Sequence, residues 1–553
     1  MSTDCSPQLT FWDLGTQQVT VDVHGGRVVT DAGLLPLRLL DKELGVLRAI
    51  AARLPDARAQ KFVTHTREAL LTQEVYQILA GYPDGNDAQV LRDDPLFQTL
   101  VDVTPDAERK LASGSTWNRF PQAYPRRHAE RPWAERPVRQ EIDAALSQRL
   151  RLLNDYLPEL FIRTRRTPPT FVILDVDPTD DPTHGQQGLS CFHGSFDQHQ
   201  YFPLLVFDGA SGFPLAAWLR PGTVPASCGV VATLRRMVEV LRAAWPDVLI
   251  LRHGDSGLAV PEIYEFCEAE GLLYALGYSS NDVLKERTAT AGSDVQTYDA
   301  FYRYREPEGQ RFAVIEDCQA ASWSRPRRVV AKIEINRHGI NRRFVVTNLS
   351  GHGPGIDHGF YVQRGDVPEK PMGQLKNGLQ MDRWSFHRFR AHGLKLLEHT
   401  LASALVVRHR EATAALPEIA RAEVRTLRQK LWTVGAVVTT SVRRIGFHFA
   451  ETWPHRDLFV RGGPAVQSFV ASLRQPASSA GPIAGLLPLA EPARKFRKAA
   501  GRWPAEIPCK KGAKTRLRRG TPKIDRPQTA FQLPARYVNR DRGTAQSTVR
   551  KAG

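Results

Sequence analysis

The sequence contains little cysteine and no long hydrophobic run. Its six cysteines stand far apart, and no two of them form a CxxC pair. This spacing excludes a paired-cysteine zinc module and gives no sign of a disulfide framework. No apolar stretch reaches transmembrane length, and the first ten residues, MSTDCSPQLT, lack the pattern of a signal peptide. We therefore expect a protein of the reducing cytoplasm that has no membrane partner.

Apolar residues are plentiful enough for folded domains. They make up 42% of the chain, which also contains ten tryptophans, and this composition is typical of globular cores rather than of wholesale disorder. At usual domain sizes, 553 residues suffice for roughly three or four domains.

Positive charge is concentrated near the C-terminus. The net charge is +17, and residues 491–553 contain 18 Lys and Arg against 4 Asp and Glu. The stretch KKGAKTRLRRGTPK (Lys510–Lys523) has no hydrophobic period and is rich in Gly, Thr and Pro. We predict a flexible, disordered basic tail over residues 463–553. Such a tail suits a polyanion, most often nucleic acid, and a solubilising role is the alternative.

Hydrophobic periodicity divides the rest of the chain into three segments. Spacings of three and four residues predict a mainly helical N-terminal region, residues 1–160. Residues 165–410 alternate strand and helix patterns, with a β-rich insertion at about 285–350 where apolar and polar residues alternate. Residues 411–462 read as a helix followed by a hairpin. The predicted fold class is therefore α/β, with a helical region before it and the basic tail after it.

Carboxylates gather at the end of a predicted buried strand. The stretch FVILDVDPTDDPTHG (Phe171–Gly185) places four aspartates within seven residues, directly after a run of β-formers. Like charges repel and are costly to bury, so a cation is the expected remedy. Asp255 follows a second predicted strand, Val248–Leu251. Because sites assemble at strand ends in α/β sheets, these oxygens predict a pocket for Mg²⁺ or Mn²⁺.

A third group of chemical interest lies in the stretch YVQRGDVPEKPMGQLKNGL. It contains Tyr361, Arg364, Glu369 and Lys376 on a loop that runs into a predicted helix. Glu369 and Lys376 are two helical turns apart, so both can face one side. The glutamate would hold metal, and the basic residues would hold phosphates.

Several blocks in order resemble a known family, the DDE transposases of bacterial insertion sequences with a Tyr-Arg-Glu-Lys signature. The chain is most similar to the insertion-sequence family numbered thirteen-eighty. The resemblance covers roughly residues 10–460. Blocks that carry it include ILDVDPTDDPTHGQQ, LLVFDGASGFPLAAWLRPG, LRHGDSGLAVPEIYEFCEAEG and SVRRIGFHFAETWP.

The family implies a ribonuclease H-like catalytic domain with a β-rich insertion before the glutamate. The resemblance assigns the first ligand to Asp177, the second to Asp255 and the glutamate to Glu369. Asp175 is two residues earlier on the same strand face and is an alternative first ligand. The family separates its Arg and Glu by three residues, whereas RGDVPE separates them by four, with Pro368 before the glutamate. We predict that the loop before Pro368 absorbs the extra residue; Asp366 is an alternative ligand.

Other interpretations apply to several of these residues. Asp180 and Asp181 are typical of capped turns. His184, His193 and His199 lack the tight spacing of zinc ligands. Trp323 lies in the β insertion and could stack on an unpaired base at a DNA end, as the resemblance implies, while a core position is the alternative.

The sequence as a whole predicts a transposase. It would bind terminal inverted repeats through the helical N-terminal region, then cut double-stranded DNA and join it to a target. Both steps would be phosphoryl transfers with Mg²⁺, or Mn²⁺, and a homodimer would pair the two ends. Tyr361, Arg364, Lys376 and Trp323 would contact the DNA. The alternatives are a degenerate DNA-binding derivative and a metal-dependent nuclease without strand transfer.

Overall fold

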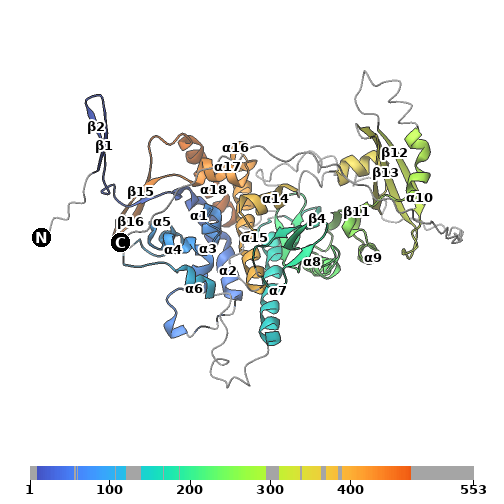
Figure 1. Ribbon diagram of the computed structural model, residues 1–553, viewed down its shortest axis with the longest axis horizontal. Helices are drawn as coiled ribbons and strands as arrows, with labels where there is room; N and C mark the ends of the chain where they lie inside the picture. Colours follow the sequence, from blue (N-terminus) through green and yellow to red (C-terminus); the bar gives the residue numbers. More distant parts are fainter. Residues whose placement is uncertain are drawn as a thin grey trace, which may run out of the picture. The chain divides into compact units, whose positions relative to one another are not determined.

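Helices and strands alternate along most of the chain, so the fold is mixed α/β, as predicted (Figure 1). The structure is a computed structural model. It describes residues 9–474 except for positions 55, 57, 59, 106–107, 120–138, 166, 186, 294–309, 337–338, 363–368 and 384–388. The chain divides into two compact units, Met1–Trp503 and Pro504–Gly553, and every described residue belongs to the first.

An eight-stranded sheet is the largest sheet of the described residues. The strands, in their order across the sheet, are β12 (Gln310–Cys318), β13 (Arg327–Asn336), β14 (Gly339–Thr347), β11 (Leu273–Tyr278), β10 (Leu249–Gly254), β4 (Phe171–Pro178), β8 (Leu204–Asp208) and β9 (Pro214–Trp218). β10 runs parallel to both of its neighbours, β4 and β11, and the remaining pairs are antiparallel. Counted in chain order from β4, the five strands from β9 to β11 lie in the order 3-2-1-4-5.

β4 is apolar along most of its length because both of its faces are covered. Val172, Leu174 and Val176 belong to the main core, while Phe171 and Ile173 belong to a second core on the other face. Strands buried on both faces carry nearly continuous apolar runs. Asp175 and Asp177 continue the face of Phe171 and Ile173, since side chains alternate along a strand.

The predicted β insertion extends the central sheet. β12, β13 and β14 form an antiparallel meander, and β14 pairs with β11 from Ala275↔Thr347 to Tyr278↔Phe344. Helix α10 (Asp282–Arg287) precedes the meander. The insertion therefore adds three strands to the edge that β11 would otherwise leave unpaired.

Helices predominate from residue 35 to residue 163. They are α1 (Leu35–Leu44), α2 (Val46–Arg53), α3 (Arg67–Ala80), α4 (Asp87–Val90), α5 (Pro95–Leu100), α6 (Gly114–Arg119) and α7 (Arg139–Arg163). Before them, β1 (Leu9–Leu14) and β2 (Gln17–Val21) form a hairpin that the periodicity did not predict. α8 (Val230–Ala244) and α9 (Pro261–Ala269) fall between strands of the sheet, as their spacing predicted.

Helix α15 (Phe389–Ala412) connects the N-terminal helices to the sheet. It contacts α1, α3 and α7 as well as β9, and almost all of its residues are buried. One hydrophobic core runs from Leu34 through Val176 to Val470. The predicted segments 1–160, 165–410 and 411–462 therefore contribute to one shared hydrophobic core.

The C-terminal elements return to the N-terminal region. They are α16 (Pro417–Ala420), α17 (Val424–Leu427), η9 (Arg428–Trp432), β15 (Ala436–Ser441), β16 (Arg444–Phe449) and α18 (Arg456–Arg474). β15 pairs with β3 (Val28–Val29), which completes a small sheet. The predicted tail boundary at residue 463 is wrong, because α18 continues to Arg474. Val466 and Val470, one helical turn apart, are buried in the core and hold this last stretch. The rest of the predicted tail lies outside the described residues.

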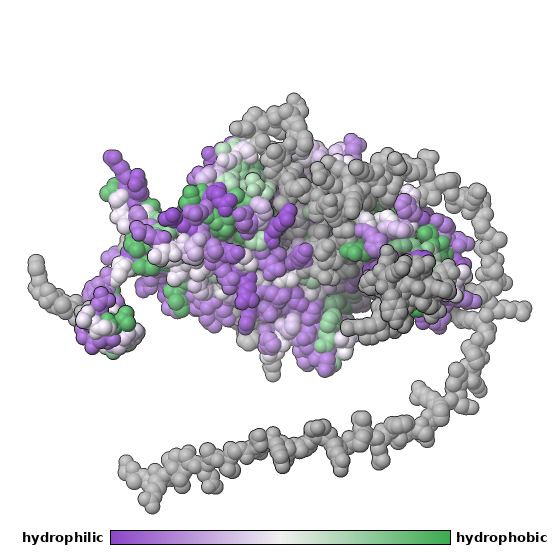
Figure 2. Space-filling view, turned by 90° about the horizontal axis from the view of Figure 1, so that it is seen from above, coloured by the Kyte–Doolittle hydropathy of each residue, from purple (hydrophilic) through white to green (hydrophobic). Residues whose placement is uncertain are grey.

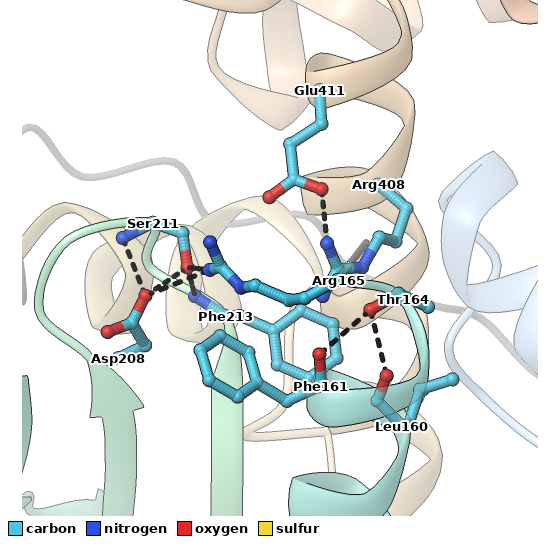
Figure 3. A network of polar contacts seen from close by, with 9 residues as sticks. All are labelled: Leu160, Phe161, Thr164, Arg165, Asp208, Ser211, Phe213, Arg408 and Glu411. Atoms are coloured by element: carbon cyan, nitrogen blue, oxygen red, sulfur yellow. Dashed lines mark hydrogen bonds and ion pairs between the residues drawn. The ribbon is translucent and has the colours of Figure 1, made fainter. Parts of the chain in front are cut away.

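A polar network holds the turn between β8 and β9 (Figure 3). Arg165 donates to Asp208 Oδ2 at 3.4 Å and to Ser211 Oγ at 3.3 Å. From α15, the guanidinium of Arg408 lies 4.4 Å from the centroid of the Phe213 ring. The turn is therefore fixed from two sides, by the end of α7 and by α15.

On the face drawn in Figure 2, the described residues are largely hydrophilic, with separate apolar areas. Among the described residues, no helix combines the length and apolar character needed to cross a membrane.

Buried charge on α15 makes the stability of the fold depend on pH. Lys395 forms an ion pair with Glu74 of α3, and both side chains are buried. Burial raises the pKa of the nearby Glu398 from 4.5 to about 8, although Lys395 partly opposes the shift. Folding therefore favours the protonated acid. The stabilisation is complete below about pH 4.5 and is lost as the pH rises through 8.

Glu398→Gln should remove the part of this pH dependence that Glu398 causes, because the amide mimics the protonated acid. Lys395, whose pKa burial lowers from 10.5 to about 8, still titrates in the variant. We expect the variant to be more stable than the parent at pH 8–9, by on the order of 1–3 kcal/mol, and similar to it at pH 5. Urea unfolding at both pH values measures the difference. Glu239→Gln is the control, since this side chain is 57% exposed. An equal effect at both pH values would contradict the assignment.

Candidate active site

Asp177 lies near the end of strand β4, and Asp255 directly follows the adjacent parallel strand β10. The register between β4 and β10 runs from Phe171↔Leu249 to Asp175↔His253. Asp177 and Asp255 each stand two residues beyond the last pair, so the same register would align them. Residues two apart on a strand share a face. The two residues therefore stand at neighbouring strand ends, and the convergence of their carboxylates stays a prediction.

The Asp255 side chain does not cap a turn. The residue precedes the short helix η6 (Ser256–Leu258), but its side chain makes no capping hydrogen bond. Its Oδ1 atom is buried and has no hydrogen-bond partner among the described residues. A buried carboxylate oxygen without a donor is costly and is a suitable ligand for a hard cation.

Asp175 and His253 form a buried pair that the sequence analysis missed. His253 Nδ1 lies 3.5 Å from Asp175 Oδ1, and the side chains are 2% and 0% exposed. The His253 ring also lies 4.6 Å from the ring of Phe360, centroid to centroid. Each member stands two residues before a predicted ligand. The stretches DVD (175–177) and HGD (253–255) have this spacing in common, and it was the sequence signal that could have indicated the pair.

Tyr361 reaches the Asp255 loop. It ends the π-helical turn η7 (Asp357–Tyr361), which follows α12 (Gly353–Ile356). A Cβ atom built on Gly277 of β11 would lie 2.5 Å from the Tyr361 hydroxyl oxygen and 3.2 Å from the backbone nitrogen of Ser256. The glycine therefore lets the phenol pack directly on β11, beside the backbone that carries Asp255.

Lys376 reaches the end of β4. It belongs to the π-helical turn η8 (Gln374–Gly378). Its Nζ donates to Asp180 Oδ1 at 2.9 Å, to the Asp180 carbonyl at 2.8 Å and to Thr179 Oγ1 at 3.3 Å. Burial would raise the pKa of Asp180, but the hydrogen bond and charge of Lys376 outweigh it and hold that pKa below its usual value. In this structure Lys376 binds protein groups, and its predicted contact with DNA stays a prediction.

Glu369 lies at the start of helix α14 (Glu369–Gly373), between Tyr361 and Lys376 in the chain. Its backbone is described, but its side chain and Arg364 lie outside the described residues, as does Asp366. Two residues into the helix, Pro371 packs against the β8–β9 turn. A Cβ atom on Gly212, whose φ is +71°, would lie 2.9 Å from Pro371 Cγ. Pro371 is also the third residue of α14 and so falls in the first helical turn, where a missing N–H costs little.

Trp323 lies in the core and not on the surface. It is 5% exposed, its ring packs 5.6 Å from Tyr264 and 5.3 Å from Tyr278, and the Arg327 guanidinium lies 5.5 Å from its centroid. An indole covered in this way cannot stack on a base. Its assignment as a DNA-contacting residue is therefore not supported. Trp323 is a core residue, which was the alternative interpretation.

Carboxylate oxygens at the two strand ends fit a hard divalent cation. Asp255 offers a buried oxygen without a donor, and Asp177 is 5% exposed. Among the residues that the structure describes, no group of three or more His, Cys, Asp or Glu is close enough to hold a metal ion. The described residues therefore show no complete metal site, and Asp177 and Asp255 stay predicted ligands.

Gly277→Ala tests the packing of Tyr361. The added methyl group would collide with the phenol oxygen, so we expect a loss of about 1–3 kcal/mol in the free energy of unfolding. In a Tyr361→Phe background the hydroxyl is absent, and the cost of Gly277→Ala should fall by at least about half. Urea unfolding of the four proteins measures the coupling. Purely additive effects would contradict the contact.

Comparison with known proteins gives a matching family and similar solved structures. The family described as "Transposase DDE domain group 1" matches residues 12–470. Among solved structures, the chain is similar to the piggyBac transposase in a synaptic complex with hairpin DNA, solved by cryo-electron microscopy. Sequence identity is 12%, the match covers 87% of each chain, and the TM-score is 0.38. No curated protein matches the chain.

Proposed function

The chain belongs to the transposase family with a group 1 DDE domain, and from this premise we propose that it cuts and joins DNA at the carboxylates Asp177, Asp255 and Glu369. The observation that supports the proposal is the parallel register of β4 and β10, which ends at Asp175↔His253, two residues before Asp177 and Asp255. The strand order 3-2-1-4-5 supports a ribonuclease H-like core. The sequence blocks favour an insertion-sequence transposase of the family numbered thirteen-eighty.

Glu369 is proposed as the third ligand because both flanks of its helix are held at the site. Before it, Tyr361 packs beside Asp255. After it, Lys376 binds Thr179 and Asp180, two and three residues beyond Asp177. Tyr361 and Lys376 therefore each lie at one of the two strand ends. The loop at 363–368 would absorb the extra residue.

The three carboxylates would hold Mg²⁺, or Mn²⁺. A bound pair of these ions would activate the attacking oxygen and stabilise the leaving oxygen of an in-line phosphoryl transfer. Lys376 neutralises Asp180 and so keeps a further negative charge away from the incoming phosphate. Asp175, paired with His253, would support β4 and β10 behind the ligands.

The proposed substrate is double-stranded DNA: the terminal inverted repeats of the parent element and a target. The helical N-terminal region would read the repeats, and Arg364, with Tyr361 and Lys376, would contact phosphates. Two ends must be held together, so a homodimer on DNA is proposed. The enzyme would work in the bacterial cytoplasm, on the nucleoid.

Asp255→Asn and Glu369→Gln should each lower strand transfer at least about 100-fold, because each removes a cation ligand. The assay uses cut ends of the parent element, with Mg²⁺ present or absent. Both variants should also bind Mn²⁺ more weakly in a calorimetric titration. Asp282→Asn is the control, since its side chain is 98% exposed.

The same assay separates the alternatives. If Glu369→Gln cuts DNA as well as the parent and Asp366→Asn does not, Asp366 is the third ligand. Cutting without joining would indicate a nuclease. A parent protein that binds the ends but never cuts them would indicate a degenerate DNA-binding derivative.

The basic C-terminal residues are proposed to bind DNA phosphates. Deleting residues 491–553, which contain 18 Lys and Arg, should weaken binding to random-sequence duplex and flatten the dependence of log K on log salt. Fluorescence anisotropy at four salt concentrations measures the slope. A second variant, with Gln in place of every Lys and Arg of residues 510–523, keeps the length and should shift the slope part of the way. An unchanged slope would assign the tail another role.

A further inference from the structure

A small antiparallel sheet leaves the central sheet directly after Asp177. It consists of β5 (Asp181–Pro182), β7 (Gln198–Tyr201) and β6 (Cys191–His193), in that order. Gln198 Nε2 donates to Asp180 Oδ2 at 3.2 Å, and Asp180 also accepts from Lys376. Two side-chain contacts, Gln198 with Asp180 and Asp180 with Lys376, therefore link the β6–β7 hairpin to the segment that contains Glu369 and Lys376.

The hairpin exposes an aromatic ring on each of its faces. Phe192 is 51% exposed and pairs across the strands with His199, ring to ring at 5.7 Å. Phe196, in the turn, is 44% exposed and packs on His193 at 5.0 Å. Because neighbouring residues on a strand point to opposite faces, His193 and Phe196 lie on the side away from Phe192.

The base of the hairpin is fixed, so these rings are held in place. Tyr201 is fully buried, and its hydroxyl donates to the carbonyl of Gly188 at 3.0 Å. A Cβ atom on Gly222 would lie 2.1 Å from the carbonyl oxygen of Gln200, so the next loop presses on the β7 backbone. A rigid platform loses little conformational entropy when it binds a ligand.

Strain and exposure coincide at Leu189, just before β6. Its φ is +64°, a left-handed conformation that is unfavourable for a bulky side chain. The same side chain is 55% exposed. The fold thus maintains a strained apolar residue in solvent beside the two rings, and such strain is typical of functional sites.

The chemistry of the hairpin suits bases better than phosphates or a second protein. No Lys or Arg occurs between Thr179 and Phe202, so the hairpin offers no cation for a DNA backbone. Three half-exposed apolar side chains present roughly 300 Å². A stable protein interface needs about 800 Å² on each partner. The area fits one or two nucleobases, which stack on any aromatic ring.

We propose that the β6–β7 hairpin is a base-stacking wedge, in which Phe192 and Phe196 stack on unpaired bases of the DNA strand bound at Asp177 and Asp255. This inference rests on the proposed function and specifies how that site holds its substrate. Stacking on both faces would keep the strand unpaired next to the phosphate that reacts.

The test compares the full-length chain with the double variant Phe192→Ala/Phe196→Ala. Fluorescence anisotropy at about 0.3 M salt, which suppresses the contribution of the basic tail, measures binding to single-stranded dT20 and to the dA20·dT20 duplex. We expect affinity for dT20 to fall at least about tenfold and affinity for the duplex to change less than about twofold. With 5-iododeoxyuridine in place of dT, photo-crosslinks should map to the peptide that contains Phe192 and Phe196.

Phe62→Ala is the matched control, because Phe62 is 69% exposed in the separate turn η2 (Gln60–Phe62) and should leave both affinities unchanged. An unchanged affinity for dT20, an equal loss on duplex, or crosslinks confined to other peptides would overturn the wedge. So would a dimer that becomes monomeric without any loss of dT20 binding. A protein that crosslinks as expected but never cuts DNA would refute the proposed function while the wedge stands.

Discussion

The parallel pairing of β4 with β10 decides where the important charges of this protein lie. One register, ending at Asp175↔His253, brings two acidic strand ends together. Carboxylates this close repel one another, and burial increases the cost. Lys376 beside Asp180 offsets part of that cost. Both Asp175 oxygens and Asp255 Oδ1 remain buried without a hydrogen-bond partner among the described residues, and a divalent cation would relieve this cost.

Helix α15 packs against both the sheet and the N-terminal helices, so all of them share one core. It also brings ionisable groups into that core. There Lys395 forms an ion pair with Glu74, and burial raises the pKa of Glu398. The β8–β9 turn depends on the same helix through Arg408. Pro371 of α14 packs on that turn at Gly212. The position of the proposed glutamate helix is thus linked to the core, although α14 itself is only five residues long.

The segment around Glu369 is helical although its sequence disfavours a helix. Its helix contains a proline and is too short to be stable alone. Contacts at its flanks replace the missing intrinsic stability, with Tyr361 against Gly277 on one side and Lys376 against Asp180 on the other. Both anchors lie in π-helical turns, η7 and η8. Such turns each accommodate an extra residue and are frequent at functional sites.

The sequence by itself determined the family and the strands around the proposed site, and tertiary structure decided which residues contact one another. Apolar runs such as FVIL and LIL had to be buried strands, and the aspartates after them had to lie at strand ends, because hydrophobic period is a local property. The ordered blocks were specific enough to indicate the transposase family. Period could not show that Trp323 is covered by Tyr264 and Tyr278, that Asp175 pairs with His253, or that β12–β14 extend the central sheet through β11. Those features depend on contacts between residues far apart in the chain, and such contacts exist only once the register and packing of the whole core are set.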